Sequence, residues 1–381
     1  MAKGIEAVRN MWSKHFTYDE WMESRGVPIY RGYYIANLRT LELGWSEERQ
    51  CNTAFIQLTG QEGVTAARVT EIAPGKTLPP VKFALDEIVY VVEGRGLTTL
   101  ATAGGKSKKS FEWQKHSMFL IPHNSRHQFS NMQGDKPVRL LHYSYLPLAL
   151  SAVRDPNFLF GNSYEAPDIG AGQEGDFYSE AKMVKNATLD TSWGRNVFWY
   201  GNFFPDMRAW DKLDTNPRRG AGGRSVYIQF HDSEMSCHMS LFDSRTYKKA
   251  HRHGPGVSIV IPIGEGYSIM WPEGGEKVVV PWHEASFFTP PDRWFHQHFN
   301  SGTAIARYLA FHAAPQFSRS ERIEDASRDQ IEYPQEEPWV REKFEGEMAK
   351  HKSTSLMPPE AYKEMNYKWE FKEDAYAKPM G

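Results

Sequence analysis

The chain has 381 residues, long enough for two ordinary domains with additional arms or linkers. Its 45 Lys and Arg nearly balance 47 Asp and Glu, so the formal net charge is −2, which argues against a nucleic-acid partner and favours a small molecule. The two cysteines, Cys51 and Cys237, form no CxxC pair, which excludes a disulfide framework and a zinc–thiolate site.

No signal-peptide core and no apolar stretch approaching 18 residues is visible in the sequence. We therefore expect no membrane partner and a cytoplasmic location, consistent with the low cysteine content. Aromatic residues make up 14% of the chain, which suits either packed sheets or a pocket for a flat substrate.

The amino-acid composition changes along the chain, and these changes predict five segments. Residues 1–52 mix helical spacing with turn residues and are predicted to form an N-terminal arm. Residues 53–150 and 225–315 each contain short β-branched and aromatic runs separated by Gly, Pro or Asn, which is typical of all-β barrels. Residues 151–224 are predicted to form a connection. Residues 316–381 are charged and helix-prone, and we interpret them as a C-terminal arm of helices and extended chain, available to pack on a neighbouring subunit.

Two motifs, each a set of five positions at fixed spacing, can be placed in both halves of the chain. The second copy of the first motif lies 170 residues after its first copy, and the second copy of the second motif lies 169 residues after its first copy. The first motif falls on Gly75, Val81, Phe83, Glu87 and Gly94, and again on Arg245, His251, His253, Val257 and Gly264. The second falls on His116, Pro122, Asn124, His127 and Asn131, and again on Ala285, Pro291, Arg293, His296 and Asn300. Agreement of the two offsets to within one residue indicates an internal duplication.

Three histidines of the second half form a candidate metal site. Residues two apart on a strand point to the same face, so His251 and His253 would present imidazoles about 7 Å apart on one barrel wall. His296 from another strand would complete a three-nitrogen set with open coordination positions. The alternative is that His-Arg-His is a surface turn, because Gly-Pro-Gly follows it directly.

The two motifs resemble those of the cupin family, and the duplication resembles a double-barrel cupin. The resemblance covers roughly residues 53–148 and 225–315. It implies two double-stranded β-helix barrels, with Val257 in place of the usual glutamate in the second barrel and Val81 and Phe83 in place of the histidines in the first. The first barrel would then serve structure and assembly, and the chain would form a homodimer or homotetramer.

Three-histidine cupin sites resemble those of gentisate-type, salicylate-type, diketone-cleaving and thiol dioxygenases, and the second half resembles the gentisate type in particular. The resemblance implies Fe(II) and dioxygen acting on a small aromatic or enolisable substrate that bears hydroxyl or carboxyl groups. One departure is that the working metal of those enzymes is usually in the first barrel. Imidazole also suits Zn, Mn, Ni and Cu, which leaves lyase, isomerase, decarboxylase or hydrolase chemistry open, as well as a non-catalytic binding barrel.

Four further residues are predicted to act on the substrate. His298 would share a face with His296 and could act as acid, base or hydrogen-bond donor, or be a core histidine. Arg293 could bind a substrate carboxylate or form a surface ion pair. Tyr308 and His312 lie on one face of the last strand with small alanines, where they could touch a ligand unless that face points outward.

Overall fold

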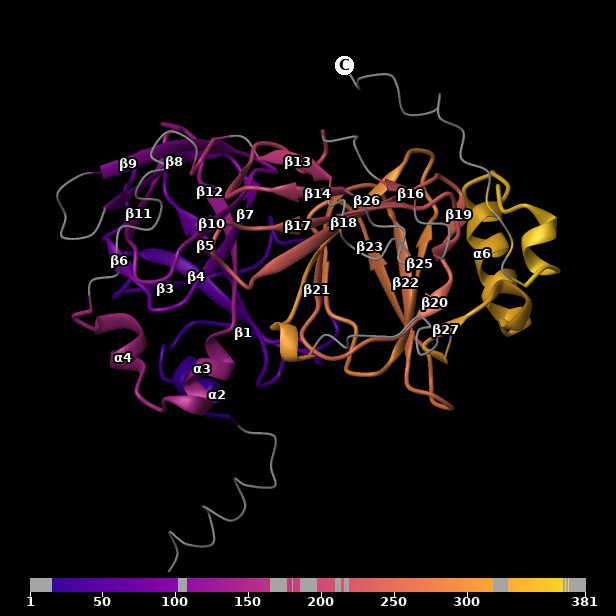
Figure 1. Cartoon of the computed structure of the whole chain (residues 1–381), viewed down its shortest axis with the longest axis horizontal. Helices are drawn as coiled ribbons and strands as arrows, with labels where there is room; N and C mark the ends of the chain where they lie inside the picture. The colour runs from indigo at the N-terminus through magenta and orange to yellow at the C-terminus, as the bar shows by residue number, and fades with distance from the viewer. Residues whose placement is uncertain are drawn as a thin grey trace, which may run out of the picture.

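Strands dominate the computed structural model. It describes residues 16–101, 108–164, 177–179, 181–185, 197–209, 214–215, 219–317 and 328–365, with Tyr367 and Trp369. Within these residues the strands form two β-barrels side by side, the first indigo to purple and the second salmon to orange (Figure 1). The predicted all-β fold class is confirmed. None of the helices in these ranges combines the length and apolar character needed to cross a bilayer.

The first barrel has two sheets. The larger runs in the order β1 (Ile29–Tyr30), β4 (Cys51–Ile56), β5 (Ala66–Ile72), β12 (Val138–Ser144), β7 (Glu87–Glu93), β10 (Met118–Ile121) and β15 (Phe203–Phe204), with β3 (Gly44–Ser46) beside β4. The smaller runs in the order β6 (Val81–Lys82), β11 (Arg126–Asn131), β8 (Arg95–Ala101) and β9 (Lys108–Gln114).

The second barrel repeats this arrangement. Its larger sheet runs in the order β13 (Lys182–Lys185), β14 (Val197–Tyr200), β17 (Arg224–Gln229), β18 (Ser236–Phe242), β26 (Ala306–Phe311), β21 (Ser258–Ile263), β24 (Phe287–Phe288) and β2 (Tyr34–Ile35), with β16 (Asp214–Thr215) beside β17. Its smaller sheet runs in the order β23 (Val278–Trp282), β22 (Gly266–Trp271), β25 (Phe295–Asn300), β20 (Ala250–His251) and β27 (Gln330–Ile331), with β19 (Thr246–Tyr247) beside β25.

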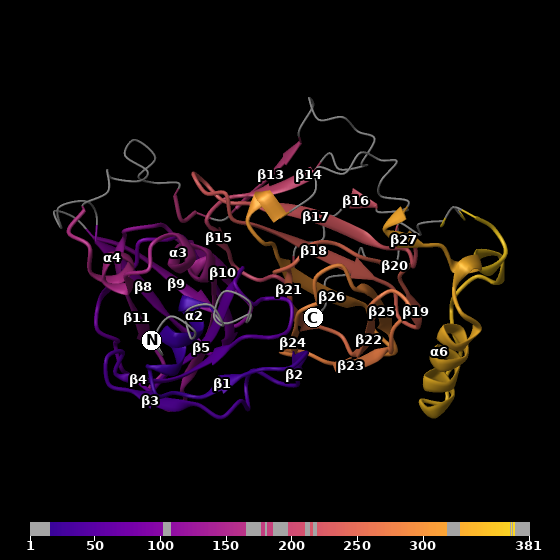
Figure 2. The ribbon, with the colours of Figure 1, turned by 90° about the horizontal axis from the view of Figure 1, so that it is seen from below.

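Each barrel receives a strand from outside its own segment. β2, from the predicted N-terminal arm, pairs with β24 of the second barrel, and the two lie together in Figure 2. β15, from the predicted connection, pairs with β10 of the first barrel. Both strands have two residues, too few for an alternating pattern to be visible in the sequence. The predicted N-terminal arm and the predicted connection therefore each contribute a strand to the sheet of a barrel.

The helices of the described residues lie on the outside of the two barrels (Figure 1). α2 (Thr17–Glu23), α3 (Leu146–Ala152) and α4 (Pro156–Gly161) lie at the first barrel, and α6 (Pro338–Lys350) lies at the far end of the second (Figure 1). Two short 3-10 helices, Pro315–Phe317 and Tyr333–Gln335, precede α6, and a third, Pro359–Tyr362, follows it. Phe344 and Met348 of α6 belong to one apolar cluster with Tyr247 and Phe299 of the second barrel. This part of the C-terminal arm thus packs on its own chain.

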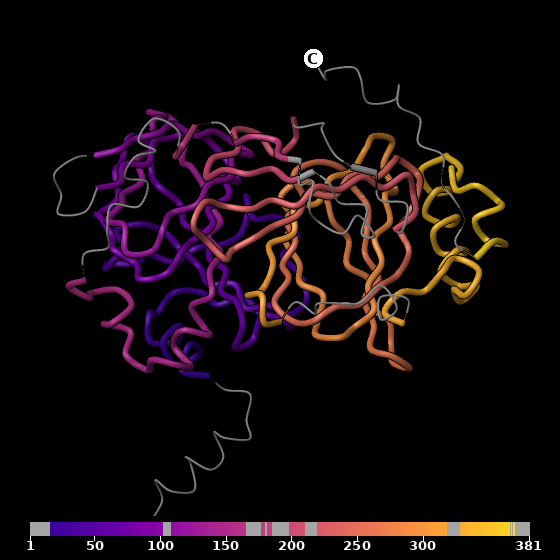
Figure 3. The backbone as a smooth tube through the Cα atoms, in the orientation of Figure 1, coloured from indigo at the N-terminus to yellow at the C-terminus, as the bar shows by residue number. Residues whose placement is uncertain are grey.

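A continuous apolar core joins the two barrels. β7 is buried on both faces because Val89 and Val91 fill the interior of the first barrel, whereas Ile88 and Tyr90 belong to the core shared with the second. Across the shared core the Tyr143 hydroxyl donates to the Gly256 carbonyl at 2.5 Å. Figure 3 shows the indigo-to-purple tube of the first barrel beside the salmon-to-orange tube of the second. The larger sheets of the two barrels therefore pack face to face and bury each other's apolar side chains.

Backbone conformation supports the duplication. Four motif positions have positive φ in both halves: Gly75 and Arg245 (65° and 58°), Gly94 and Gly264 (91° and 106°), His116 and Ala285 (70° and 69°), and Asn124 and Arg293 (55° and 60°). Left-handed backbone disfavours residues with a Cβ, by about 1–2 kcal/mol each. The left-handed backbone conformation is therefore present in both halves even at the motif positions that are not glycine. The strand register agrees, since Val81 pairs with His127 and His251 with His296.

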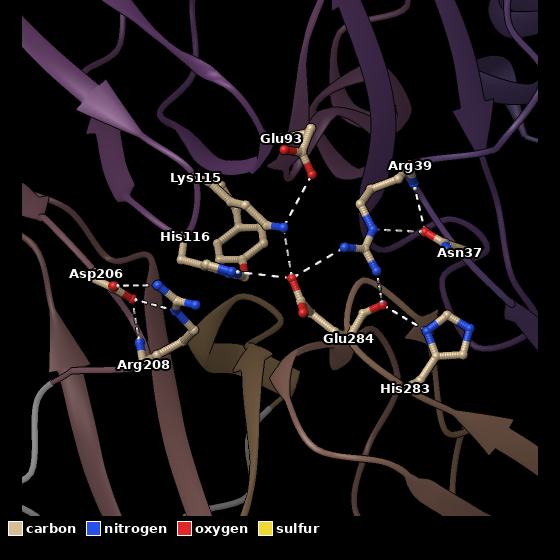
Figure 4. A network of polar contacts seen from close by, with 10 residues as sticks. Asn37, Arg39, Glu93, Lys115, His116, Asp206, Arg208, His283 and Glu284 are labelled. Atoms are coloured by element: carbon tan, nitrogen blue, oxygen red, sulfur yellow. Dashed lines mark hydrogen bonds and ion pairs between the residues drawn. The ribbon is translucent and has the colours of Figure 1, made fainter. Parts of the chain in front are cut away.

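An ion-pair network closes the contact between the barrels (Figure 4). One carboxylate oxygen of Glu284, from the second barrel, lies 3.0 Å from Lys115 Nζ, 3.3 Å from His116 Nε2 and 3.3 Å from Arg39 Nη1. Partial burial opposes ionisation of Glu284, but Lys115, Arg39 and His116 outweigh it and hold the pKa of this carboxyl below its usual range. Glu284 is therefore ionised at neutral pH, whereas burial lowers the pKa of His116 to about 4 and leaves this imidazole neutral.

Replacing Glu284 by Gln should lower the free energy of unfolding by about 1 kcal/mol, because the side chain is partly exposed and solvent screens its partners. Urea unfolding in low salt should show the loss, and 1 M NaCl should remove most of it. Glu276→Gln, at an exposed position, should change stability by less than about 0.5 kcal/mol. Equal stability of Glu284→Gln and the parent in low salt would contradict a stabilising network.

Candidate metal centre

Three histidines of the second barrel converge. His251 lies on β20, His296 lies opposite it on β25, and His253 follows two residues after His251. One ligand nitrogen from each of the three lies within 4.8 Å of those of the other two. The ring centroids of His251 and His253 are 4.2 and 4.6 Å from that of His296. The structure thus brings together the three predicted ligands, and in the described residues no other group of three His, Cys, Asp or Glu side chains does so.

Hydrogen bonds to backbone carbonyls determine which ring nitrogen of two of these imidazoles is available to a metal. His253 Nδ1 lies 2.8 Å from the Gly254 carbonyl and His296 Nδ1 lies 3.3 Å from the Trp294 carbonyl. A carbonyl only accepts, so each Nδ1 carries the proton and each Nε2 keeps its lone pair. The Nδ1 of His251 is buried without a hydrogen-bond partner in the described part of the chain.

The three ligands are neutral. Burial lowers the pKa of His253 to about 4, and it lowers the pKa values of His251 and His296 further, helped by Arg219 and the neighbouring histidines. A metal ion requires unprotonated imidazole, so protons do not compete for these nitrogens near neutral pH. Three neutral imidazoles, one with an unpaired buried nitrogen, fit a divalent transition metal. Val257, where the motif has Glu, packs against the apolar interior and adds no charge to the set.

The turn before His296 is held by the C-terminal arm. Arg293 places Nη1 and Nη2 at 3.1 and 2.6 Å from the two carboxylate oxygens of Asp329. Arg252 adds a 2.9 Å contact to the same carboxylate, and Arg293 N donates to the His253 carbonyl at 3.0 Å. The ion-pair alternative for Arg293 is therefore present in the structure. Its substrate-binding role remains a prediction.

His298 and Tyr308 lie beside the three histidines. The His298 ring is 5.5 Å from His296 and 4.8 Å from Tyr308. His298 Nδ1 shares a 2.8 Å hydrogen bond with the Ser268 hydroxyl, which also accepts from the Trp282 indole at 3.0 Å. Burial, with Lys248, lowers the pKa of His298 to about 3, so this imidazole is neutral. The first barrel has the same Trp113–Thr98 bond but carries Phe129 in place of the histidine.

His312 follows β26 and pairs with a histidine that the sequence did not indicate. His238 Nδ1 lies 2.7 Å from His312 Nε2, and Ser236 Oγ lies 2.9 Å from His312 Nδ1. The His238 ring is 5.7 Å from Tyr308, whose ring is 4.8 Å from His298, so ring contacts connect this pair with the three ligands. Alternation along β18 could have placed His238 inside the barrel with Ser240 and Phe242, but its partner lies 74 residues away.

The corresponding place in the first barrel holds an ion pair. Glu87 accepts from Arg68 at 3.0 Å and from His142 Nδ1 at 2.8 Å. Burial opposes ionisation of Glu87, but Arg68 and His142 lower its pKa well below the usual range. Burial lowers the pKa values of His127 and His142 to about 4. The negative charge of Glu87, at the motif position that could face a metal, is thus compensated by the Arg68 guanidinium.

No family model matches the chain. An uncharacterized protein of Methanocaldococcus jannaschii, MJ1618, is 34% identical over 88 residues, and the match spans 23% of this chain and 65% of the relative's length.

Among solved structures, vicilin from Capsicum annuum has a TM-score of 0.46 at 12% identity, covering 76% of this chain and 87% of its own. Oxalate decarboxylase from Bacillus subtilis at pH 4.6 has a TM-score of 0.44 at 9% identity, covering 75% and 77%. Another structure of that enzyme, from work on its Mn(II) centres, has a TM-score of 0.45 at 11% identity, covering 77% and 78%. At these values the neighbours identify neither a family nor an activity for this chain.

Proposed function

We propose that the second barrel is the active site of an iron-dependent dioxygenase that cleaves a small aromatic or enolisable compound bearing hydroxyl or carboxyl groups. The convergence of three neutral imidazoles without a carboxylate carries the proposal, because such a set keeps the full charge of a divalent ion and leaves open positions for a chelating substrate and dioxygen. When bound, ferrous iron would supply Lewis acidity and one-electron chemistry with dioxygen.

The residues of the chain have separate tasks in this proposal. His251, His253 and His296 hold the metal, and the carbonyls behind His253 and His296 fix the orientation of those two rings. The buried rings of Phe288 and Tyr308, 5.8 and 4.8 Å from His298, exclude water from one side of the site. His298, neutral and held by Ser268, can exchange a hydrogen bond with the substrate.

The same site could instead use Zn, Mn or Ni as a Lewis acid for lyase, isomerase, decarboxylase or hydrolase chemistry. The His238–His312 pair favours keeping this candidate, because two hydrogen-bonded imidazoles can accept and return a proton. Oxygen dependence separates the two functions. The small-molecule partner, the homo-oligomer and the cytoplasmic location predicted from the sequence remain part of the proposal.

Protein reconstituted anaerobically with Fe(II) should consume oxygen when mixed with one of a panel of small hydroxylated aromatic acids and diketones. His251→Ala should lower the rate at least 100-fold, because it removes one of three metal ligands, and metal content should fall with it. His351→Ala, at an exposed position after α6, serves as the control and should keep both properties. Unchanged oxygen uptake in His251→Ala would refute the assignment, and oxygen-independent turnover with Zn, Mn or Ni would establish the alternative.

A further inference from the structure

A lysine lies inside the second barrel without a carboxylate partner. Lys248 is 1% exposed. Its ammonium donates to the Ser240 hydroxyl and lies 5.1 and 4.9 Å from the ring centroids of Phe242 and Tyr308. Within the described residues it forms no ion pair. The adjacent Lys249 differs, because its ammonium lies 2.6 Å from a carboxylate oxygen of Glu332.

The surroundings of Lys248 add positive charge. Burial, and then the charge of Arg219, lower the pKa of Lys248 to about 7. Arg219 also lowers the pKa values of the four histidines at the metal centre. The motif position that usually carries Glu is Val257, and a divalent metal would add two further charges. Among the residues that the structure describes, no carboxylate pairs with this buried ammonium, although a buried charge needs such a partner.

Two rings, those of His298 and Tyr308, lie between His296 and the Lys248 ammonium. The His298 ring lies 5.5 Å from His296 and 4.8 Å from Tyr308, and the Tyr308 ring lies 4.9 Å from the Lys248 ammonium. The backbone N of Lys248 also donates to the His298 carbonyl at 2.9 Å, which ties the lysine to the strand that carries a ligand. A molecule at the three histidines therefore has a cation on the far side of His298 and Tyr308.

We propose that the substrate is an anion and that its carboxylate pairs with Lys248 while its other oxygens face the three histidines. This inference rests on the proposed function, since it takes the histidines as metal ligands. It narrows the substrate class to a chelating acid with a carboxylate separate from the chelating oxygens. Lys248 is then the residue that distinguishes the acid from its neutral analogue.

Cobalt-loaded protein provides a test that needs no turnover, because visible cobalt bands report chelation. The probes are 2,3- and 3,4-dihydroxybenzoate and the two corresponding benzamides, which share the chelating hydroxyls and differ in charge. At least one acid should bind the wild-type protein ten times more tightly than its amide. In Lys248→Met this preference should fall below threefold, with cobalt content unchanged. Lys277→Met, which removes a lysine paired with Glu337 near the surface, should keep the preference.

The outcomes separate this inference from the proposed function. Bound cobalt with no preference for either acid in the wild-type protein would overturn the inference alone, and so would a tenfold preference that persists in Lys248→Met. If Lys248→Met does not fold, Lys248→Gln and the wild-type comparison decide by the same criteria. Protein that binds no cobalt would overturn the metal centre and with it the inference.

Discussion

Metal-free protein should lose most of its free energy of unfolding between pH 7 and pH 5. The cause is a set of buried histidines whose pKa values are lowered first by burial, among them His127, His142, His253 and His298, with pKa values of about 4, 4, 4 and 3. In the unfolded chain a histidine has a pKa of about 6.5. Below that value the unfolded chain takes up protons that the folded protein does not.

The free energy of unfolding therefore falls as the pH falls. These histidines contribute their full stability above about pH 6.5, and it is lost as the pH falls toward their folded pKa values near 4. At pH 5 the loss is about 2 kcal/mol for each histidine, or roughly 8 kcal/mol for the four. A protein of this kind has about 5–15 kcal/mol in total, so acid unfolding near pH 5 is the expected result.

Urea titrations in EDTA at pH 7.5, 6 and 5, followed by tryptophan fluorescence, should measure this loss. His298→Phe gives a matched comparison, because the first barrel already holds Phe129 at the corresponding position. This variant should lose about 2 kcal/mol less than the parent between pH 7.5 and 5. A free energy of unfolding that stays constant across this range would show that the buried histidines are not the cause.

Spacing in the sequence was sufficient to predict the cluster of three histidines. His251, His253 and His296 follow from strand alternation and from two motifs with nearly equal offsets, and the structure places their ligand atoms within 4.8 Å. The repeated positive-φ turns show why the spacing is informative. The turns set the register that pairs His251 with His296, and they do so even where Arg245 and Ala285 replace glycine.

Residues that depend on long-range contacts were not predicted. Lys248 lies in a run of two lysines, and only the fold shows that one is buried while the other pairs with Glu332. Arg68 and His142 are 74 residues apart, and no local pattern connects them. The strands β2 and β15 were missed for a different reason, since each has two residues and pairs with the opposite barrel.

Replacing Glu87 by Ala in the first barrel should lower the free energy of unfolding by about 3–5 kcal/mol. The carboxylate accepts from Arg68 and His142 inside the barrel, and its loss leaves the Arg68 guanidinium, 23% exposed, without its anion. Replacing the whole group, as Arg68→Met, Glu87→Leu and His142→Phe, should restore stability to within about 2 kcal/mol of the parent, because no buried charge remains. Chemical unfolding of the two variants at pH 7.5 tests this difference.

The same pair of variants tests whether chemistry belongs to one barrel. Because the Arg68–Glu87 pair occupies the place of a metal in the first barrel, the triple variant should bind as much cobalt or iron per chain as the parent. A fall in metal content in the folded triple variant would show that Glu87 or His142 is a ligand. If the triple variant is no more stable than Glu87→Ala, the group contributes by packing and not by charge compensation. Unchanged metal content with recovered stability would leave His251, His253 and His296 as the metal site of the chain.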